Sequence, residues 1–447
     1  MGLGSKIIAA VAIGIAIREF FAPFTGHPFD FELWLRLGYY VYHGNDPYTY
    51  TYPIPDISMP GSGVMTWLGY PPIWAFFQAG LYSLYVHSGV NDRFFYYFIV
   101  KQPMIIADVL CGFVLYKVVP ILSGIPKSGS QSLIFWMLCP FIILISAVWG
   151  MFDQIILLIV LLSALLVTKT IKSAALVALG FLLKVLPLIY VPLLAFLQET
   201  KKRKVAYLVV AGGASFFFTL VPYLFFPKWH LESLIGVGVD VSNKISNSMN
   251  YWSIVYVYQQ KYSLSQPEIE VLKILAYAWV PAILLATYFC INYVKSVRAQ
   301  ADEIKFRHVL ISMLFITLVF MLTKSAVNEQ YTIYFLGFGL VDYFALGSRT
   351  RRKIFHGIWI TALGFAIANN VFLVRFLEPL STLYVYEEYV MTQGLIGNVR
   401  FGLLATFGIC FSILSFLYLR SLYHDMRSAI LKERGEVKGK LVGANVG

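Results

Sequence analysis

Two carboxylates one residue apart lie near the start of the chain, in Gly26-His27-Pro28-Phe29-Asp30-Phe31-Glu32-Leu33-Trp34. Acidic residues are scarce, since Asp and Glu together make up 23 of the 447 residues. A carboxylate that water can reach can act as a general base and take a proton from an acceptor hydroxyl. Alternatively, an acid in the first turn of a helix stabilises the helix N-terminus. The spacing alone leaves both interpretations of Asp30 and Glu32 open.

Cationic side chains within or beside apolar segments form a second group that could do chemistry. They are Lys101, Lys184, Lys324, Arg375 and Arg400. Fixed cations can stabilise a departing phosphate anion. A lone lysine in an apolar segment can instead extend its ammonium to the membrane surface. Both interpretations stay open for these residues.

Two further acids, Asp108 and Asp153, lie within or at the ends of apolar segments. Asp108 follows Lys101 by seven residues, which is about two helical turns, so we expect the two to form a buried ion pair. Asp153 follows a Trp-Gly turn and is expected to cap the helix that begins there.

The composition indicates a multi-pass α-helical membrane protein. The chain is 59% hydrophobic and 13% charged, with a mean hydropathy of +0.71. Its apolar segments recur at the length needed to cross about 30 Å of hydrocarbon. The net charge of +12 does not indicate nucleic acid, because the bases cluster in short loops between apolar segments. We expect these loops in the cytoplasm. Contact of the basic C-terminal tail with anionic membrane lipids is a lesser alternative.

The apolar segments predict about 11 to 13 transmembrane helices with both termini in the cytoplasm. The predicted spans are 5–23, 73–87, 94–119, 132–148, 153–168, 173–197, 205–226, 272–294, 308–323, 331–346, 354–376 and 401–419. Lys184 and Pro187 interrupt one of them, which favours two half-helices there. Lysines at 117, 127, 169 and 172 also require a re-entrant or broken segment between 73 and 200.

We expect a single transmembrane domain over 1–423 and a cytoplasmic tail over 424–447 that forms a short helix. An acidic, base-poor outer loop over about 22–72 should carry a helix on the membrane surface from Asp30 to His43. A turn at Gly44-Asn45-Asp46-Pro47-Tyr48 and a helix start at Tyr70-Pro71-Pro72 follow it. The four cysteines are expected to be buried and unpaired.

Motifs in a particular order along residues 5–345 resemble those of the GT-C glycosyltransferases, and among them mannosyltransferase-like proteins. The motifs are Asp30-x-Glu32, Gly44 to Tyr48, Tyr70-Pro71-Pro72, Lys101-Gln102-Pro103 with Ala107-Asp108, Cys139-Pro140 with Trp149 to Asp153, Lys184 to Pro187, Asn250 to Ser253, and Val327 to Tyr331. Cys139 and Met151 depart from the family pattern, which has Asn and Gln there.

The resemblance implies a GT-C-like bundle and an inverting glycosyltransferase. The enzyme would move a hexose, mannose by preference, from a polyprenyl-phosphate sugar to a hydroxyl of a lipid-linked glycan or similar acceptor on the outer face. Asp30 would be the base and Glu32 its assistant. Donor phosphate binding would fall to Lys101, Lys184, Lys324 and Arg400. Substrate binding would fall to Tyr48, Tyr70, Asp153, Asn250, Tyr251, Trp252, Asn328, Glu329, Gln330 and Tyr331.

The resemblance also allows a small membrane partner subunit. It places the protein in the plasma membrane of a prokaryote or the endoplasmic reticulum of a eukaryote. No cofactor is expected. His27 and His43 flank the acidic pair, but their spacing matches no known metal site, so we expect no metal.

Two alternatives to this function remain. One is a transporter or lipid flippase, which also needs intramembrane charges. The absence of an internal repeat from the sequence and the long acidic loop argue against it. The other is a transferase that attaches lipid-linked sugar to protein, which usually carries a sizeable soluble domain.

Overall fold

The computed structural model describes residues 2–48, 70–231, 248–262, 264–296, 302–345, 347–381 and 383–444. Within these ranges the chain is built from helices and their connections, with one isolated β-bridge between Gly26 and Leu377. The predicted all-α class is confirmed. The stretch 49–69 of the predicted outer loop lies outside the described residues.

The first half of the chain forms helices at every predicted span. They are α1 (Leu3–Phe21), α2 (Pro28–Tyr42), α3 (Pro72–His87), α4 (Arg93–Ser123), α5 (Pro126–Leu138), α6 (Pro140–Ile143), η1 (Leu144–Trp149), α7 (Asp153–Leu165), α8 (Thr170–Leu183), η2 (Leu186–Tyr190), α9 (Val191–Phe196), α10 (Lys201–Leu220) and α11 (Pro222–Phe225).

The second half follows the predicted spans in the same way. Its elements are α13 (Trp252–Lys261), α14 (Gln266–Leu275), α15 (Trp279–Ser296), α16 (Asp302–Thr323), η3 (Glu329–Tyr331), α17 (Thr332–Ala345), α18 (Arg349–Asn369), η4 (Val374–Phe376), α19 (Tyr384–Thr392) and α20 (Gly394–Ala444).

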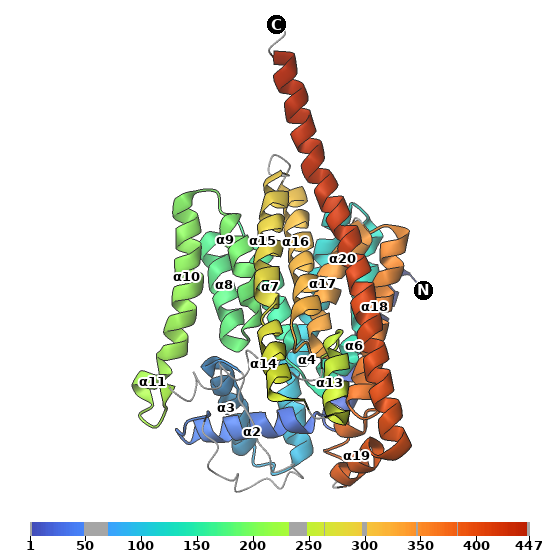
Figure 1. Ribbon diagram of the computed structural model, residues 1–447. Helices are drawn as coiled ribbons and strands as arrows, with labels where there is room; N and C mark the ends of the chain where they lie inside the picture. Colours follow the sequence, from blue (N-terminus) through green and yellow to red (C-terminus); the bar gives the residue numbers. More distant parts are fainter. Residues whose placement is uncertain are drawn as a thin grey trace.

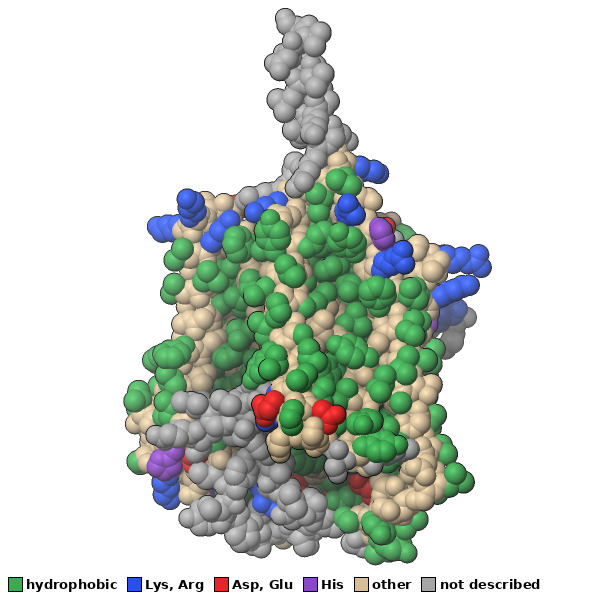
Figure 2. All heavy atoms as spheres, in the orientation of Figure 1, with side chains coloured by type: hydrophobic (Ala, Val, Ile, Leu, Met, Phe, Trp, Pro, Cys, Tyr) green, Lys and Arg blue, Asp and Glu red, His purple; other side chains and the backbone are tan. Residues whose placement is uncertain are grey.

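The long helices run side by side, and α2 crosses beneath them at one end (Figure 1). The helix ends that carry the basic runs lie together at the other end, where α20 projects toward the C-terminus. Figure 2 shows Lys and Arg side chains gathered at that end, above a broad surface of hydrophobic side chains. This polarity fits the charge pattern of the loops, and the cytoplasmic placement of the basic end stays a prediction.

Among the described residues, 5 helices are long and apolar enough to cross a membrane, or 6 if one bent pair counts as a single span. These numbers support a multi-pass membrane protein but fall below the predicted 11 to 13 spans. The difference arises because several predicted spans form short helices, while α1 and α18 are long enough but carry several charged residues. The 14 residues of α8, for example, rise only about 21 Å.

Both predicted interruptions between 73 and 200 are present. The segment after Lys117 is broken where Pro126–Leu138 and Pro140–Trp149 meet at an angle of 48°. A proline cannot donate the helical hydrogen bond, so Pro140 starts a new helix after Cys139. The predicted half-helices are also confirmed, because α8 ends at Leu183, and η2 and α9 follow Lys184 as separate short elements.

The predicted Lys101–Asp108 ion pair is wrong. Asp108 instead accepts a hydrogen bond from Arg18 of α1 at 2.7 Å, and the indole of Trp136 donates to it at 2.7 Å. Arg18 also donates to the carbonyl of Met137 at 2.8 Å. Seven residues of helix separate Lys101 and Asp108 by about 10.5 Å along the axis, too far for direct contact.

Two predictions for the C-terminal part need correction. Residues 424–444 are helical as predicted, but they do not form a separate short helix, because α20 continues without a break from Gly394 to Ala444. Cys410, on the same helix, is exposed rather than buried. The other three cysteines are buried, and all four are unpaired as predicted.

Gly150 makes the turn between η1 and α7 that brings Trp149 and Asp153 to the same region. Its φ is +86°, a left-handed conformation that favours glycine. A Cβ at this position would lie 2.8 Å from the Phe31 ring and 2.9 Å from Cε of Lys101. Glycine is therefore required here by both backbone conformation and packing.

We expect Gly150→Ala to lower the free energy of unfolding by about 1–3 kcal/mol through backbone strain and overpacking. Gly212→Ala is the matched control, because no atom lies within 4 Å of its Cβ position and helix α10 would gain up to about 1 kcal/mol. The measurement is the melting temperature of each purified variant in detergent micelles. Equal melting temperatures for the two variants would contradict the role assigned to Gly150.

Candidate functional site

Asp30 lies in the first turn of α2 but does not cap that helix. His27 is the N-cap residue, and no side-chain hydrogen bond caps the helix. Asp30 is only 8% exposed, and its Oδ2 accepts a hydrogen bond from the indole Nε1 of Trp149 at 2.8 Å. Among the described residues, its other oxygen, Oδ1, accepts no hydrogen bond. The carboxylate is therefore oriented through one oxygen, while the other can still accept a proton.

His27 and Trp149 complete the surroundings of this carboxylate. Nδ1 of His27 lies 3.1 Å from Oδ2 of Asp30, although not in hydrogen-bonding geometry. The imidazole stacks on the indole of Trp149, with ring centroids 5.1 Å apart, and Phe376 meets it edge-on at 6.0 Å. From the sequence, His27 was a candidate only for metal binding, and Trp149 had no predicted role. His27 precedes Asp30 by three residues, and this spacing could have indicated that the two side chains lie close together on a helix.

Lys101 holds the two segments around Asp30 together. Its fully buried ammonium donates to the carbonyls of Thr25 and Ala147, the latter at 2.6 Å, and to Oγ1 of Thr25 at 3.2 Å. An ammonium has three N–H groups, so none remains for a donor phosphate in this arrangement. We therefore assign Lys101 to positioning rather than to the predicted phosphate contact.

Lys184 and Asp153 form a buried ion pair next to this region. Nζ of Lys184 lies 2.8 and 2.9 Å from the two oxygens of Asp153, and Tyr334 donates its hydroxyl to Asp153 at 3.0 Å. The ammonium also lies over the rings of Tyr331 and Phe152, at 4.8 and 5.3 Å from their centroids. Asp153 is the first residue of α7 and Phe152 is its N-cap, so the predicted capping role of Asp153 is wrong.

Electrostatic coupling joins Asp30 to this ion pair and to Glu329. The negative charge of Asp30 interacts electrostatically with the Lys184 ammonium and with the Tyr70 hydroxyl. Burial raises the pKa of Tyr70 well above its usual value, and Asp30 and Asp153 add to that rise. Burial also raises the pKa of Glu329, with a smaller contribution from Asp30. Asp30, Tyr70, Asp153, Lys184 and Glu329 thus form one cluster, which we call the acid–lysine cluster.

Glu32 lies on a different side of α2 from Asp30. Residues two apart on a helix are separated by about 200° around its axis. Glu32 forms an ion pair with Arg36 at 2.6 Å. Burial raises the pKa of Glu378, and repulsion from the charge of Glu32 adds to that rise. Glu378 in turn accepts a hydrogen bond from the hydroxyl of Tyr97. The two carboxylates of the motif therefore have separate surroundings.

The turn at Gly44 to Tyr48 forms as predicted and positions Tyr70. Oδ1 of Asp46 accepts a hydrogen bond from the backbone N–H of Tyr48 at 2.9 Å. The Tyr48 hydroxyl donates to the carbonyl of Tyr70 at 2.9 Å, and α3 begins at Pro72 as predicted. The Tyr70 ring then packs edge-on against Phe152 at 5.2 Å.

Asn250 and its neighbours lie at the end of α16. The Asn250 amide donates to the carbonyls of Met321 and Lys324, at 2.8 and 2.9 Å, so it satisfies the helix end. Trp252 is buried, whereas Tyr251 is 44% exposed and stacks on it at 5.9 Å. The Lys324 ammonium lies over the Trp279 ring at 5.2 Å.

The remaining predicted residues differ in exposure. Asn328 is exposed, while Glu329 and Gln330 are buried, and Glu329 accepts a hydrogen bond from Asn369 at 2.7 Å. Arg400 donates to the carbonyls of Ala368 and Asn369, at 2.9 and 3.0 Å, and so holds the end of α18. Arg400 therefore supports the segment next to Glu329 rather than the acid–lysine cluster itself.

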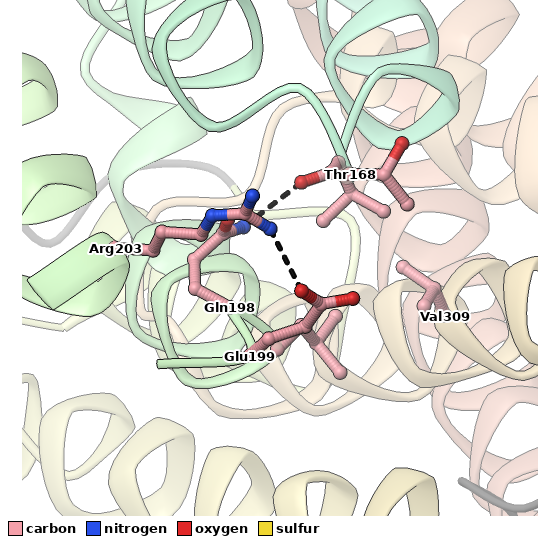
Figure 3. Close-up of a pocket in the computed structure, with 7 residues that line it drawn as sticks. Thr168, Gln198, Glu199, Arg203 and Val309 are labelled. Carbon is pink, nitrogen blue, oxygen red and sulfur yellow. Dashed lines mark hydrogen bonds and ion pairs between the residues drawn. The ribbon is translucent and has the colours of Figure 1, made fainter. Parts of the chain in front are cut away.

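A pocket of about 330 Å³, including its open mouth, lies away from this cluster, at the basic end of the bundle (Figure 3). It is lined by Val167, Thr168, Leu197, Gln198, Glu199, Arg203 and Val309. Arg203 pairs with Glu199 at 2.7 Å, and Gln198 donates to the carbonyl of Val167 at 2.9 Å. None of the predicted site residues lines this pocket.

No group of three or more His, Cys, Asp or Glu residues in the described ranges is arranged to hold a metal ion. His43, the second histidine of the motif region, is exposed, and its Nδ1 lies 2.8 Å from the carbonyl of Tyr39. The expectation that no metal takes part stays a prediction.

Comparison of the chain with models of protein families finds no match, and comparison with curated proteins finds none either. The resemblance to the GT-C glycosyltransferases therefore stays a prediction from its motifs.

We expect Lys184→Met to lower the free energy of unfolding by about 3–5 kcal/mol, because it leaves the Asp153 carboxylate buried without its cation. The double variant Lys184→Met with Asp153→Leu should recover much of this loss, since it removes both charges. Thermal unfolding in detergent micelles measures both effects. Additive losses in the double variant would show that the two side chains do not interact as described.

Proposed function

We propose that the protein is an inverting glycosyltransferase with Asp30 as its general base. The observation that carries this proposal is the Asp30 carboxylate, which is nearly buried and held through Oδ2 by Trp149 while Oδ1 accepts no hydrogen bond among the described residues. A base needs a fixed position and an oxygen that can still take a proton. The adjoining cation of Lys184 suits a substrate that carries negative charge.

The proposed reaction is a single displacement. The oxygen of an acceptor hydroxyl forms a bond to the anomeric carbon of the sugar while the bond from that carbon to the phosphate oxygen breaks. The hydroxyl proton passes to Oδ1 of Asp30. The electron pair of the broken bond leaves with the polyprenyl phosphate, and a nearby cation stabilises the phosphate. The configuration at the anomeric carbon is inverted because attack and departure occur on opposite faces.

Two of the predicted phosphate-binding cations keep that role in the proposal, Lys184 and Lys324. Burial lowers the pKa of Lys324 to about 8, so its ammonium is charged at neutral pH and neutral at higher pH. Lys101 and Arg400 act instead as positioning residues, because both donate to backbone carbonyls. Tyr70, Tyr331 and the exposed Tyr251 offer aromatic surfaces for the sugar.

The substrates follow from the resemblance to the GT-C family. The proposed donor is a polyprenyl-phosphate hexose, with mannose preferred, and the proposed acceptor is a lipid-linked glycan or a similar hydroxyl compound. The proposed setting is the outer face of the membrane, and the proposed partner is a small membrane subunit. A multi-pass bundle with the cluster near one end suits substrates that both reside in the membrane.

The pairing of the buried charges supports the proposal of an enzyme rather than a transporter. Charges that serve transport usually lie along a path through the membrane and change partners. Asp108 is instead paired with Arg18, and Lys101 donates to carbonyls of the same chain. These charged groups connect helices and do not form a chain of polar groups that could pass a proton or an ion along the bundle.

We expect Asp30→Asn and Asp30→Ala to lower the rate of sugar transfer by about 10²–10⁴-fold, the usual contribution of a general base. Transfer from a synthetic polyprenyl-phosphate mannose to extracted lipid-linked acceptors measures the rate. Glu270→Gln is the control, because Glu270 is an exposed acid, paired with Lys273, outside the acid–lysine cluster. Wild-type rates in both Asp30 variants would remove Asp30 from the mechanism.

We also expect the transfer rate to fall as pH rises through about 8, because Lys324 then loses the charge that stabilises the departing phosphate. Arginine stays charged in this range, so Lys324→Arg should move the decline to higher pH. Lys324→Met should reduce transfer at pH 7 by about 10²–10³-fold. The measurement is the pH profile of kcat for the three proteins. Identical alkaline declines in wild type and Lys324→Arg would exclude Lys324 as the source.

A further inference from the structure

Helix α19 carries hydrophobic side chains on its exposed face. Val385, Tyr386, Tyr389 and Val390 are 50%, 66%, 62% and 44% exposed, respectively. Their spacing of i, i+1, i+4 and i+5 places them on one side of the helix. Tyr384, on the opposite side, is 3% exposed.

The acidic residues of α19 are turned toward the protein. Glu388 pairs with Arg375 of η4, with Nε of Arg375 3.1 Å from Oε2 of Glu388, and both side chains are 23% exposed. Glu387 is also partly buried. A helix in contact with water has the reverse pattern, with apolar residues inward and charged residues outward. The outward face of α19 therefore fits an apolar environment.

The position of α19 identifies this environment as lipid. The helix lies at the end of the bundle opposite the C-terminus, beside the start of α20 (Figure 1). The exposed apolar surface continues from α19 into α20, where Leu395, Ile396 and Val399 are 79%, 46% and 49% exposed. Gly394–Lys432 of α20 is itself a candidate membrane span. Hydrophobic side chains are visible on the surface around this end of α20 (Figure 2).

We propose that α19 lies in the headgroup region of the lipid leaflet at this end of the bundle, with the face of Val385, Tyr386, Tyr389 and Val390 in contact with lipid. Tyrosine is enriched at this depth, because its ring is apolar and its hydroxyl reaches water and headgroups. An amphipathic helix in this position buries its apolar face by about 5–10 Å into the leaflet.

The lipid-bound helix is linked to the surroundings of Asp30. Arg375, which holds Glu388, is next to Phe376, and Phe376 packs edge-on against His27. The backbone N–H of Gly26 donates to the carbonyl of Phe376 at 3.0 Å. α19 therefore holds this end of the bundle at a constant depth relative to the membrane surface. The proposal does not depend on the reaction that Asp30 performs.

Spin labels on single cysteines test the proposal in vesicles of phosphatidylcholine and phosphatidylglycerol. The full-length protein first receives Cys410→Ser, because Cys410 is the exposed cysteine and the others are buried. Tyr386→Cys and Val390→Cys then report on the outward face of α19. Collision rates with oxygen, which dissolves in lipid, and with a water-soluble nickel complex are compared for each label. The labelled side chains are exposed, so the substitutions should leave folding intact.

Two labels of known exposure provide the matched controls. Leu285→Cys lies in α15 and is 71% exposed on the span, whereas Glu199→Cys has a side chain 60% exposed at the basic end. We expect the oxygen-to-nickel ratio at positions 386 and 390 to exceed that at 199 several-fold and to stay below that at 285, because the headgroup region lies between water and the hydrocarbon core. A ratio equal to that at 199 would place the face in water. Low collision rates with both reagents would show that protein covers it. Either result would overturn the proposal.

Discussion

The buried ammonium of Lys101 is the interaction on which the arrangement around Asp30 depends. It joins the carbonyls of Thr25 and Ala147, which precede Asp30 and Trp149 in their segments. Burying an ammonium costs several kcal/mol unless its N–H groups are satisfied, so the two segments must stay together. The Lys101 side chain also limits the space at position 150, because its Cε would lie 2.9 Å from a Cβ there. Lys101 thus holds together the two segments that carry Asp30 and Trp149, the partners in the hydrogen bond that orients the carboxylate.

Other buried charges connect helices in the same way. Arg18 with Asp108 joins α1 to α4, Lys184 with Asp153 joins α8 to α7, and at the basic end Arg351 pairs with Asp342 at 2.7 Å to join α18 to α17. Apolar helix surfaces in lipid gain little from burial against one another, so directional polar contacts help to define which helices meet. These three buried ion pairs connect neighbouring elements, whereas the Asp30 carboxylate is held through a single oxygen.

The two ends of the bundle differ in charge, and the candidate site lies at the end away from the basic side chains. The basic side chains gather at one end, while α2 and α19 lie at the other. The segment that connects α18 to α19 packs on His27, so the C-terminal part of the chain contributes to the surroundings of an N-terminal motif. The site thus draws residues from all three thirds of the sequence: Asp30 and Trp149 from the first, Asp153 and Lys184 from the middle, and Glu329 and Phe376 from the last.

The sequence alone determined the all-helical class, the positions of the apolar helices, the helix start at Pro72 and the break at Lys184. These features depend on local hydrophobicity and on proline, which act within a few residues. The tertiary structure alone decided which charges meet: Asp108 binds Arg18 rather than Lys101, and Asp153 binds Lys184 rather than a helix end. It also separated Glu32 from Asp30 and brought His27 and Trp149 to the carboxylate. Partners of buried charges are set by how the helices pack, and residues as distant in sequence as Tyr97 and Glu378, 281 positions apart, come together only in the folded bundle.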